Sequence, residues 1–230
     1  MSSVIIDVET IPAQPEEEAK AAIAESIKPP STMSKPETIE QWHKGEGKYK
    51  GVKDALIEEA YRKTALDGAK GEIISVSIGD MSGSIKTVSR DMEAPEVKIL
   101  DNAFRVISAF CTGDIHTSRP YFIGHNVQFD LKFLLHRAVI NGISPGFKLP
   151  FGGRHKSDFY CTMQAWAGFG QRISQDNLCK ALGLEGKPDD ISGANVWDHV
   201  KAGDVDRVAE YNAYDVDTVR EIYKKLNFIK

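Results

Sequence analysis

The alternation of apolar and polar residues predicts that the chain begins with β-strands. Residues 4–9 alternate with a period of two, which is typical of a strand with one face in a core. Residues 72–78 and 85–88 are short apolar runs on either side of Asp80-Met81-Ser82-Gly83, and they predict a hairpin. Residues 121–123 predict a further short strand, which ends at Gly124.

Helical spacing dominates the later part of the chain. Apolar positions recurring every three or four residues predict three long helices, at residues 97–110, 127–140 and 205–226. Asp204 stands at the expected N-cap of the last one. Shorter helices are predicted around residues 163–166, 177–182 and 196–200. Strands followed by helices predict an α/β fold, with a mixed β-sheet flanked by helices.

Residues 12–70 interrupt this order. Their pattern is mostly helical, but it is broken at Pro29-Pro30, Pro36 and Gly45-Glu46-Gly47. A chain of 230 residues is long enough for one sizeable core, whereas two full domains would both be small. We therefore predict a single domain, residues 1–230, that carries a helical insertion at residues 12–70 after the first strand.

Composition leaves the chemistry open, because 41% hydrophobic and 27% charged residues are ordinary for a soluble globular protein. The 3 cysteines are far apart and form no C-x-x-C pair, so we expect no disulfide framework or zinc site, and a reducing cytoplasm fits. Neither a secretion signal nor a membrane-spanning segment is expected from the apolar runs. With a net charge of −4, any bound nucleic acid must be attracted by local basic patches and metal ions.

Carboxylates stand on three elements where apolar residues are expected. Asp7 and Glu9 share one face of the first strand, roughly 7 Å apart at about 3.3 Å per residue. Asp215 and Asp130 each interrupt the apolar stripe of a helix. A buried carboxylate must be hydrogen-bonded, paired or bound to metal. The alternatives are a wet edge strand for Asp7 and Glu9, a stripe that reaches the surface at Asp215, and a helix-dipole carboxylate at Asp130.

Three motifs hold these carboxylates, and their order and spacing are informative: Ile6-Asp7-Val8-Glu9-Thr10, Gly124-His125-Asn126 through Phe129-Asp130, and Tyr211-Asn212-Ala213-Tyr214-Asp215. With them the chain resembles the DEDD superfamily of 3′-5′ exonucleases, in the branch related to the proofreading domain of family B DNA polymerases. Residues 178–184, Gly186-Lys187 and Val196-Trp197 are similar to the lead-in to the third motif. Tyr211 lies four residues before Asp215, as in the DEDDy subtype. The resemblance covers most of the chain outside residues 12–70 and implies a ribonuclease-H-like fold.

The resemblance implies hydrolysis of phosphodiester bonds from the free 3′ end of single-stranded DNA, with release of nucleoside 5′-monophosphates. It implies two divalent ions, Mg²⁺ or Mn²⁺, held by Asp7, Glu9, Asp130 and Asp215, with Asp7 bridging both. Two such ions about 3.5–4 Å apart activate water and stabilise both reacting oxygens, and hard ions prefer carboxylate ligands. Tyr211 is expected to hydrogen-bond the attacking water; the alternative is a core tyrosine.

Further residues beside the motifs are expected to contact the substrate. The resemblance places Thr10 and Ile11 at the terminal nucleotide. Asn126 either contacts the substrate or caps the following helix, and Phe129 either stacks on a base or packs in the core. A basic tract near the second motif is expected to form either a backbone-binding rim or a solvated face: Lys132, His136, Arg137, Lys148, Arg154, His155 and Lys156.

The insertion has a basic end. Residues 44–63 hold six basic and four acidic side chains, and we expect Arg62 and Lys63 to bind substrate phosphate beside the active site. The alternatives are a solvated helical hairpin, or docking of a second subunit through Trp42 and Tyr61 to form a homo-oligomer.

Two rival functions stay open at this point. The first is the same chemistry on RNA or short oligoribonucleotides, because no residue separates ribose from deoxyribose, although we favour DNA. The second is a catalytically silent domain that binds nucleic acid or a partner. The presence of all five of Asp7, Glu9, Asp130, Tyr211 and Asp215 speaks against a silent domain, because a binding module has no need for the full set.

Overall fold

The computed structural model describes residues 2–111, 120–150 and 159–230, which fall into two compact units. The sheet unit comprises Met1–Thr10 and Ile73–Lys230, and the insertion unit comprises Ile11–Glu72. The unit boundaries enclose the insertion predicted at residues 12–70. Within the described ranges, no helix combines the length and the apolar character needed to cross a membrane.

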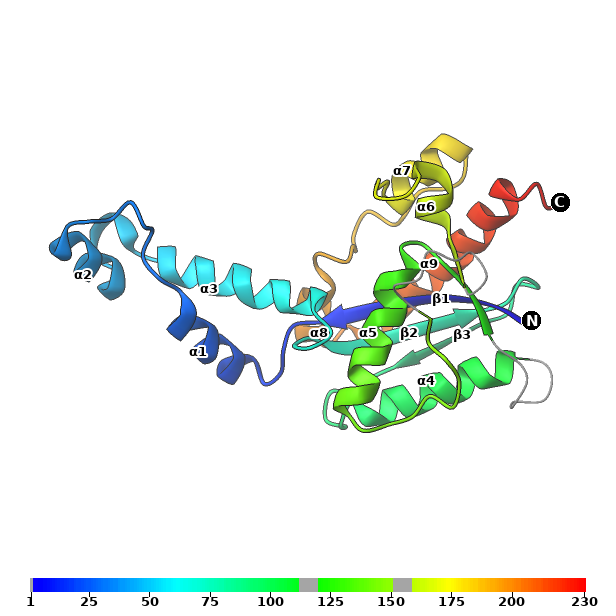
Figure 1. The fold of residues 1–230 in the computed structure, drawn as a ribbon, viewed down its shortest axis with the longest axis horizontal. Coiled ribbons are helices and arrows are strands. Elements are labelled where there is room, and N and C mark those ends of the chain that lie inside the picture. The colour runs from blue at the N-terminus through cyan, green and yellow to red at the C-terminus, as the bar shows by residue number, and fades with distance from the viewer. Residues whose placement is uncertain (1, 112–119, 151–158) are drawn as a thin grey trace. The chain divides into compact units, whose positions relative to one another are not determined.

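The sheet unit is built on a five-stranded sheet in the order β3-β2-β1-β4-β5 (Figure 1). The strands are β1 (Ser2–Ile11), β2 (Glu72–Gly79), β3 (Ile85–Ser89), β4 (Pro120–Gly124) and β5 (Phe159–Cys161). The hairpin pair β2 and β3 is antiparallel, whereas β4 runs parallel to both β1 and β5. The sheet is therefore mixed, and β1 lies in its middle.

Helices cover both faces of this sheet. Val4, Ile6 and Val8 of β1 join one core cluster with buried residues of α4 (Val97–Phe110) and α5 (Val127–Ile140). Ile5 points to the opposite face, where it packs with Val216 and Val219 of α9 (Val205–Leu226). The mixed sheet flanked by helices confirms the predicted ribonuclease-H-like α/β fold.

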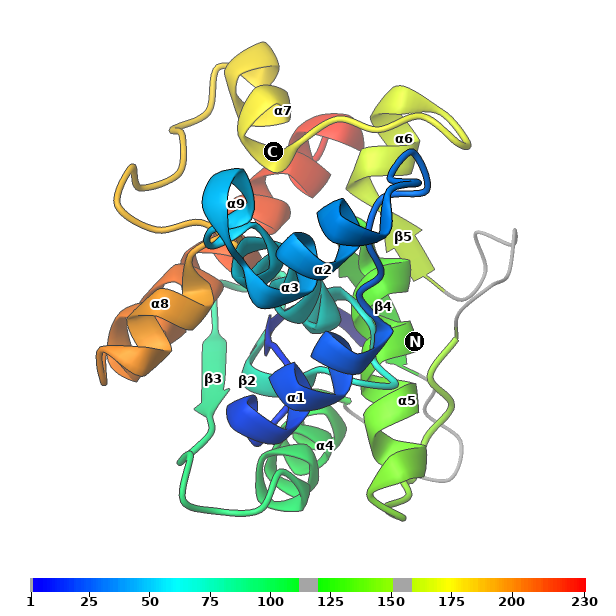
Figure 2. The same cartoon turned by 90° about the vertical axis from the view of Figure 1, so that its left-hand side faces the viewer.

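Three short helices complete the sheet unit: α6 (Thr162–Ala167), α7 (Gln175–Leu182) and α8 (Val196–Lys201). Figures 1 and 2 both show α6 and α7 on the side of this unit opposite α4. Strand β5 was not predicted, because its three residues are too few to show a period. Asp204 does stand at the N-cap position of α9, but in the described part of the chain its side chain makes no capping bond. Its carboxylate instead lies 3.3 Å from His199 Nδ1.

The insertion unit is mostly helical, as predicted. It contains α1 (Glu16–Ser26), α2 (Pro36–Lys44), the 3₁₀ turn η1 (Gly47–Tyr49), α3 (Val52–Lys63) and the 3₁₀ turn η2 (Thr64–Leu66). Helices α1 and α3 pack together, and Lys20 joins them through 2.6 Å contacts with both Glu16 and Glu58. Trp42 and Tyr61 are 1% and 0% exposed, so these two side chains are buried within the chain, and docking of a second subunit by the helices that carry them stays a prediction.

A buried ion pair joins α4, α5 and β2. Glu96, just before α4, accepts hydrogen bonds from Arg137 Nη2 at 2.6 Å, Asn141 Nδ2 at 2.8 Å and the backbone amide of Ile73 at 2.9 Å. Arg137 is buried in this contact. It therefore does not belong to a substrate-binding rim, because its charge is already used inside the protein.

We expect Arg137→Met to lower the free energy of unfolding by about 3–5 kcal/mol, because the Glu96 carboxylate would stay buried without its counter-charge. Urea denaturation measures this change. Arg105→Met is the matched control, since Arg105 pairs with Asp101 on the surface and is 75% exposed. Equal losses in the two variants would contradict a special role for the buried pair.

Candidate active site

Asp7 and Glu9 lie on the face of β1 that α9 covers. They follow Ile5 in the alternation of the strand, and Ile5 packs against α9. Glu9 is buried and Asp7 is half-buried. The alternative of a wet edge strand is wrong, because β1 has β2 on one side and β4 on the other.

Asp215 of α9 meets these two carboxylates. It is 3% exposed, so the alternative that the apolar stripe reaches the surface here is wrong. One carboxylate oxygen from each of Asp7, Glu9 and Asp215 lies within 4.8 Å of the other two. We call these three residues the acidic triad.

Asp130 faces the acidic triad from the first turn of α5, although among the described residues the 4.8 Å group does not include it. It is also 3% exposed. Burial raises its pKa well above the ordinary value, and the carboxylates of Asp7 and Glu9 raise it further. Hydrogen bonds from backbone amides, including that of Val8, act in the opposite direction. Asp130 is thus close enough to the triad for its charge to be coupled to theirs.

The start of α5 is set by close backbone packing. A Cβ on Gly124 would lie 2.9 Å from Val127 Cβ and 3.0 Å from the Ile6 carbonyl oxygen, so a side chain there would push the helix away from β1. Asn126 then opens the helix in the left-handed conformation, with φ 60°. It occupies the N-cap position, but within the described residues its side chain makes no capping hydrogen bond. The expected capping role of the Asn126 side chain is therefore wrong, and this side chain is exposed.

Desolvation sets the protonation of the triad. Burial raises the pKa of Asp7 to about 7, and the nearby carboxylate of Asp215 adds to the shift, while Lys187 and Asn212 oppose it. Burial also raises the pKa of Glu9 well above its usual value, helped by Asp7 and Asp215. Without a compensating cation, these groups therefore retain protons at a pH where exposed carboxylates are ionised.

Lys187 provides a cation from the protein itself. Its Nζ donates to Asp215 Oδ2 at 2.6 Å and to the Tyr211 hydroxyl oxygen at 2.9 Å, and it lies 4.9 Å from the centre of the Tyr211 ring. Its side chain is 22% exposed. Sequence reasoning placed Gly186-Lys187 in the lead-in to the third motif and gave Lys187 no role, because a lysine outside a periodic element gives no signal of where its charge lies.

Tyr211 lies one turn before Asp215 on α9 and is 3% exposed. Burial raises the pKa of its phenol above the ordinary value, so the hydroxyl stays protonated at neutral pH. The hydroxyl hydrogen-bonds to the Asp215 carboxylate and, together with Lys187 and Gln175, lowers its pKa, although burial leaves the net shift of Asp215 upward. Tyr211 is therefore a hydrogen-bond donor within the site.

Two buried amides hold the triad in place, and sequence reasoning gave neither of them a role. Asn212 Nδ2 donates to Asp7 Oδ2 at 2.6 Å, and its Oδ1 accepts from Ser75 Oγ at 3.0 Å. Gln175, at the start of α7, donates from Nε2 to Asp215 Oδ1 at 3.2 Å. The only sequence feature that could have indicated a role for Asn212 was its position inside the third motif. No sequence feature indicated a role for Gln175.

The other residues predicted to contact substrate are not members of the acidic triad. Phe129 is half-buried, packs against the core and lies 5.6 Å from the Phe133 ring, which fits the core alternative. Thr10 is half-buried and Ile11 is fully buried. Contact of Ile11 with a terminal nucleotide stays a prediction that requires this side chain to be uncovered.

Basic residues predicted to bind phosphate have acidic partners in the insertion unit. Arg62 Nε lies 2.6 Å from Glu58 and Lys63 Nζ lies 2.6 Å from Glu59, each one helical turn away. In the predicted basic tract, Lys132 and Lys148 are exposed. Its members Arg154, His155 and Lys156 lie outside the described residues.

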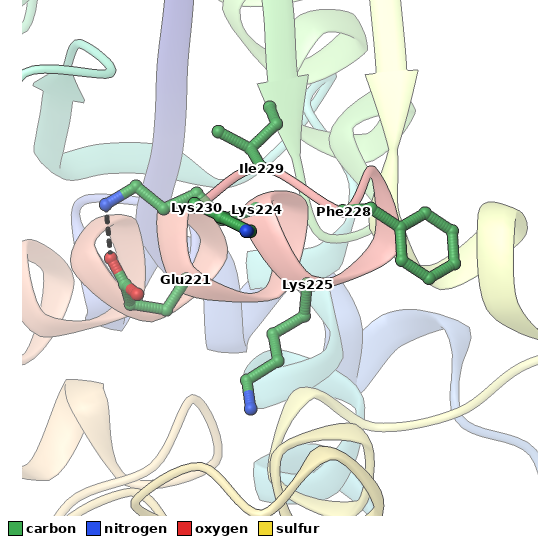
Figure 3. A pocket seen from close by; sticks show the side chains of 6 residues that line it. All are labelled: Glu221, Lys224, Lys225, Phe228, Ile229 and Lys230. Carbon is green, nitrogen blue, oxygen red and sulfur yellow. Dashed lines mark hydrogen bonds and ion pairs between the residues drawn. The ribbon is translucent and has the colours of Figure 1, made fainter.

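A separate hollow lies at the C-terminal end of α9 (Figure 3). It is lined by Glu221, Lys224, Lys225, Phe228, Ile229 and Lys230, and it contains none of the predicted site residues. Lys224 pairs with Glu221 at 2.8 Å. Because Lys224 follows Asp215 by nine residues at about 1.5 Å each, this hollow is distinct from the acidic triad.

The triad with Asp130 fits a hard divalent cation. Its converging ligands are carboxylate oxygens, which Mg²⁺ and Mn²⁺ prefer over the histidine and cysteine ligands of zinc. The arrangement therefore suits two chemical tasks, which are the compensation of buried negative charge and the binding of phosphate through a cation.

Comparison with protein families identifies a family to which most of the chain is similar. A family model described as "Predicted 3'-5' exonuclease related to the exonuclease domain of PolB" matches residues 71–230. The matched segment contains Asp130, Tyr211 and Asp215 and begins after Asp7 and Glu9. No curated protein matches the chain.

We expect the metal-free protein to lose stability as the pH rises from about 5 through 7. The folded pKa of Asp7 is about 7 and that of Glu9 is also raised, so in this range the folded state holds protons that the unfolded state has released, and rising pH then favours unfolding. Glu9→Gln should flatten this loss and be more stable than wild type near pH 8. Urea unfolding in a chelator measures both effects, with exposed Glu17→Gln as the control. A wild-type stability that rises over this range would contradict the buried protons.

Proposed function

We infer the function from the premise that the chain belongs to the family of predicted 3′-5′ exonucleases related to the exonuclease domain of PolB. We propose that it hydrolyses phosphodiester bonds one at a time from the 3′ end of a nucleic acid strand. The observation that carries this proposal is the convergence of Asp7, Glu9 and Asp215 within 4.8 Å, from a strand and a helix far apart in the chain. Such a grouping of buried carboxylates is unfavourable in the ionised form unless a bound cation offsets the negative charge.

Asp7, Glu9, Asp130 and Asp215 would hold the divalent ions, Mg²⁺ or Mn²⁺. When bound, such ions lower the pKa of a water and stabilise negative charge on the phosphate oxygens. Asp7 is placed by Asn212 and Asp215 by Gln175, so both carboxylates are held before a substrate arrives. Placement on the central strand and on a long helix keeps the ligand oxygens from moving apart.

Tyr211 would position the attacking water. Its hydroxyl is protonated, so it donates a hydrogen bond and does not act as the base. Proton acceptance falls to the carboxylates, among which Glu9 is buried beside Asp7 and Asp215. Lys187 keeps Asp215 and Tyr211 together in the absence of substrate.

The proposed substrate is single-stranded DNA with a free 3′ end, and the products are nucleoside 5′-monophosphates. The same residues serve RNA or short oligoribonucleotides equally well, because they act on the phosphate and not on the sugar. Matched DNA and RNA strands distinguish these two substrates.

We expect 5′-labelled linear single-stranded DNA to shorten from its 3′ end when Mg²⁺ is present and to stay intact in a chelator. Circular strands, and linear strands with a blocked 3′ end, should also stay intact. Rapid cutting of circles would show an endonuclease.

Tyr211→Phe should lower kcat by about 10²–10⁴-fold with little change in oligonucleotide binding, because it removes only the positioning hydroxyl. The control is Tyr223→Phe, on the same helix, where the ring packs against Tyr160. Equal losses of kcat in the Tyr211→Phe and Tyr223→Phe variants would show that Tyr211 has no specific role in the reaction.

We expect Lys187→Met to lower the free energy of unfolding of the metal-free protein at pH 8 by about 1–3 kcal/mol, because Asp215 loses a charged partner in a buried place. Added Mg²⁺ should stabilise this variant more than wild type, since Lys187 no longer competes for the Asp215 carboxylate. Lys180→Met is the matched control, because Lys180 pairs with Asp176 at 2.6 Å on the surface. A smaller stabilisation by Mg²⁺ in Lys187→Met than in wild type would show that Lys187 supports metal binding.

A further inference from the structure

The six basic residues between positions 44 and 63 divide into two groups of three. Lys44, Arg62 and Lys63 each pair with a glutamate one helical turn earlier, at 2.6 to 2.7 Å. Lys48, Lys50 and Lys53 have no acidic partner within the part of the chain that the structure describes. We call Lys48, Lys50 and Lys53 the lysine turn.

Two residues of the lysine turn, Lys48 and Lys50, lie on the short connection between α2 and α3, and Lys53 lies in the first turn of α3. Lys48 and Lys50 are exposed, and Lys53 is half-buried. Lys48 Nζ lies 5.1 Å from the centre of the Tyr49 ring, and Lys53 Nζ lies 5.9 Å from the centre of the Trp42 ring. Because an aromatic ring orients an ammonium group without neutralising it, the three charges stay available.

Three glycines determine the backbone conformation of the connection between α2 and α3. Gly45, Gly47 and Gly51 have φ values of 66°, 58° and 72°, and a Cβ added at any of them would meet nothing within 4 Å. The turn therefore needs glycine for its backbone conformation, and the open space at each Cβ position means that contact with other described residues is not what excludes a side chain there.

The chemistry of the lysine turn fits a phosphate backbone better than bases. Trp42 is 1% exposed, and Lys48 lies over the ring of the half-buried Tyr49, so neither ring is a fully open platform for a base. Lysines act on phosphate as point charges and do not read sequence. In a chain with a net charge of −4, such a turn is a local exception.

We propose that the lysine turn, and not Arg62 and Lys63, binds the phosphate backbone of a single nucleic acid strand. This inference rests on the proposed function only in taking nucleic acid as the ligand. It requires no contact with the acidic triad. Binding of a strand by the lysine turn would be independent of the base sequence.

The test is binding of fluorescent dT30 in a chelator, so that no hydrolysis occurs, over a series of salt concentrations. Each phosphate contact with a single strand contributes about 0.7 to the slope of log K against log salt. The triple variant Lys48→Gln, Lys50→Gln, Lys53→Gln should therefore reduce the slope by about 2 and weaken binding at low salt. The variant Lys48→Arg, Lys50→Arg, Lys53→Arg should keep wild-type binding.

The matched control is the triple variant Lys44→Gln, Arg62→Gln, Lys63→Gln, which removes the same formal charge from the paired group. We expect it to reduce the slope by less than half as much. Equal reductions in the two triple variants, or no reduction in the first while its circular dichroism is that of wild type, would overturn the inference. Failure of the proposed function would look different, since strand binding would follow the lysine turn while no strand is shortened with Mg²⁺.

Discussion

The burial of several carboxylates against one another is the constraint on which the rest of the structure depends. Ionised carboxylates out of water repel one another and lose their hydration, so each needs a proton, a cation or hydrogen-bond donors. All three kinds of compensation are visible here. Protons are retained through the raised pKa values of Asp7 and Glu9, Lys187 supplies a cation to Asp215, and Asn212 donates to Asp7.

The fold holds this unfavourable cluster together through elements that are stable for other reasons. Strand β1 is central in the sheet, and its apolar side chains are fully buried on both faces. Helix α9 contributes Val216 and Val219, one and four residues after Asp215, to the core cluster that contains Ile5 of β1. The repulsion between the carboxylates is therefore opposed by a packed core, which is the usual arrangement for a site that must be ready before its ligand arrives.

Long periodic segments were predictable from the sequence, and short or aperiodic ones were not. Helices α4, α5 and α9 have the bounds that their apolar spacing predicted, because burial of one helix face leaves a periodic trace. Strand β5, with three residues, leaves none. The approach of Asp7, Glu9 and Asp215 was also foreseeable, since acid on core-facing positions of separate elements is unusual enough to need an explanation.

Charge pairing was the part that sequence could not predict. A lysine or arginine is identical in the sequence whether its charge is buried against an acid, paired on the surface or unpaired. Arg137 was expected either at a backbone-binding rim or on a solvated face, and it is buried against Glu96. Arg62 and Lys63 were expected to bind phosphate and instead pair with glutamates. Lys187 was placed in the lead-in to the third motif without a role, and it contacts Asp215. Each of these outcomes depends on a partner that only the three-dimensional structure identifies.

The central claim is that the buried carboxylates form a site for divalent cations, and calorimetric titration with Mn²⁺ at about pH 6.5, below the pKa of Asp7, tests it most directly. Because the folded metal-free site retains protons, saturable binding should release protons, and the measured enthalpy should change with the ionisation enthalpy of the buffer. Asp7→Asn should abolish this binding, since it removes the charge of one of the three converging carboxylates, and Asp7 is the half-buried member of the triad whereas Glu9 and Asp215 are buried. Absence of saturable binding in the wild type, or Mn²⁺ binding of equal affinity in Asp7→Asn, would contradict the claim.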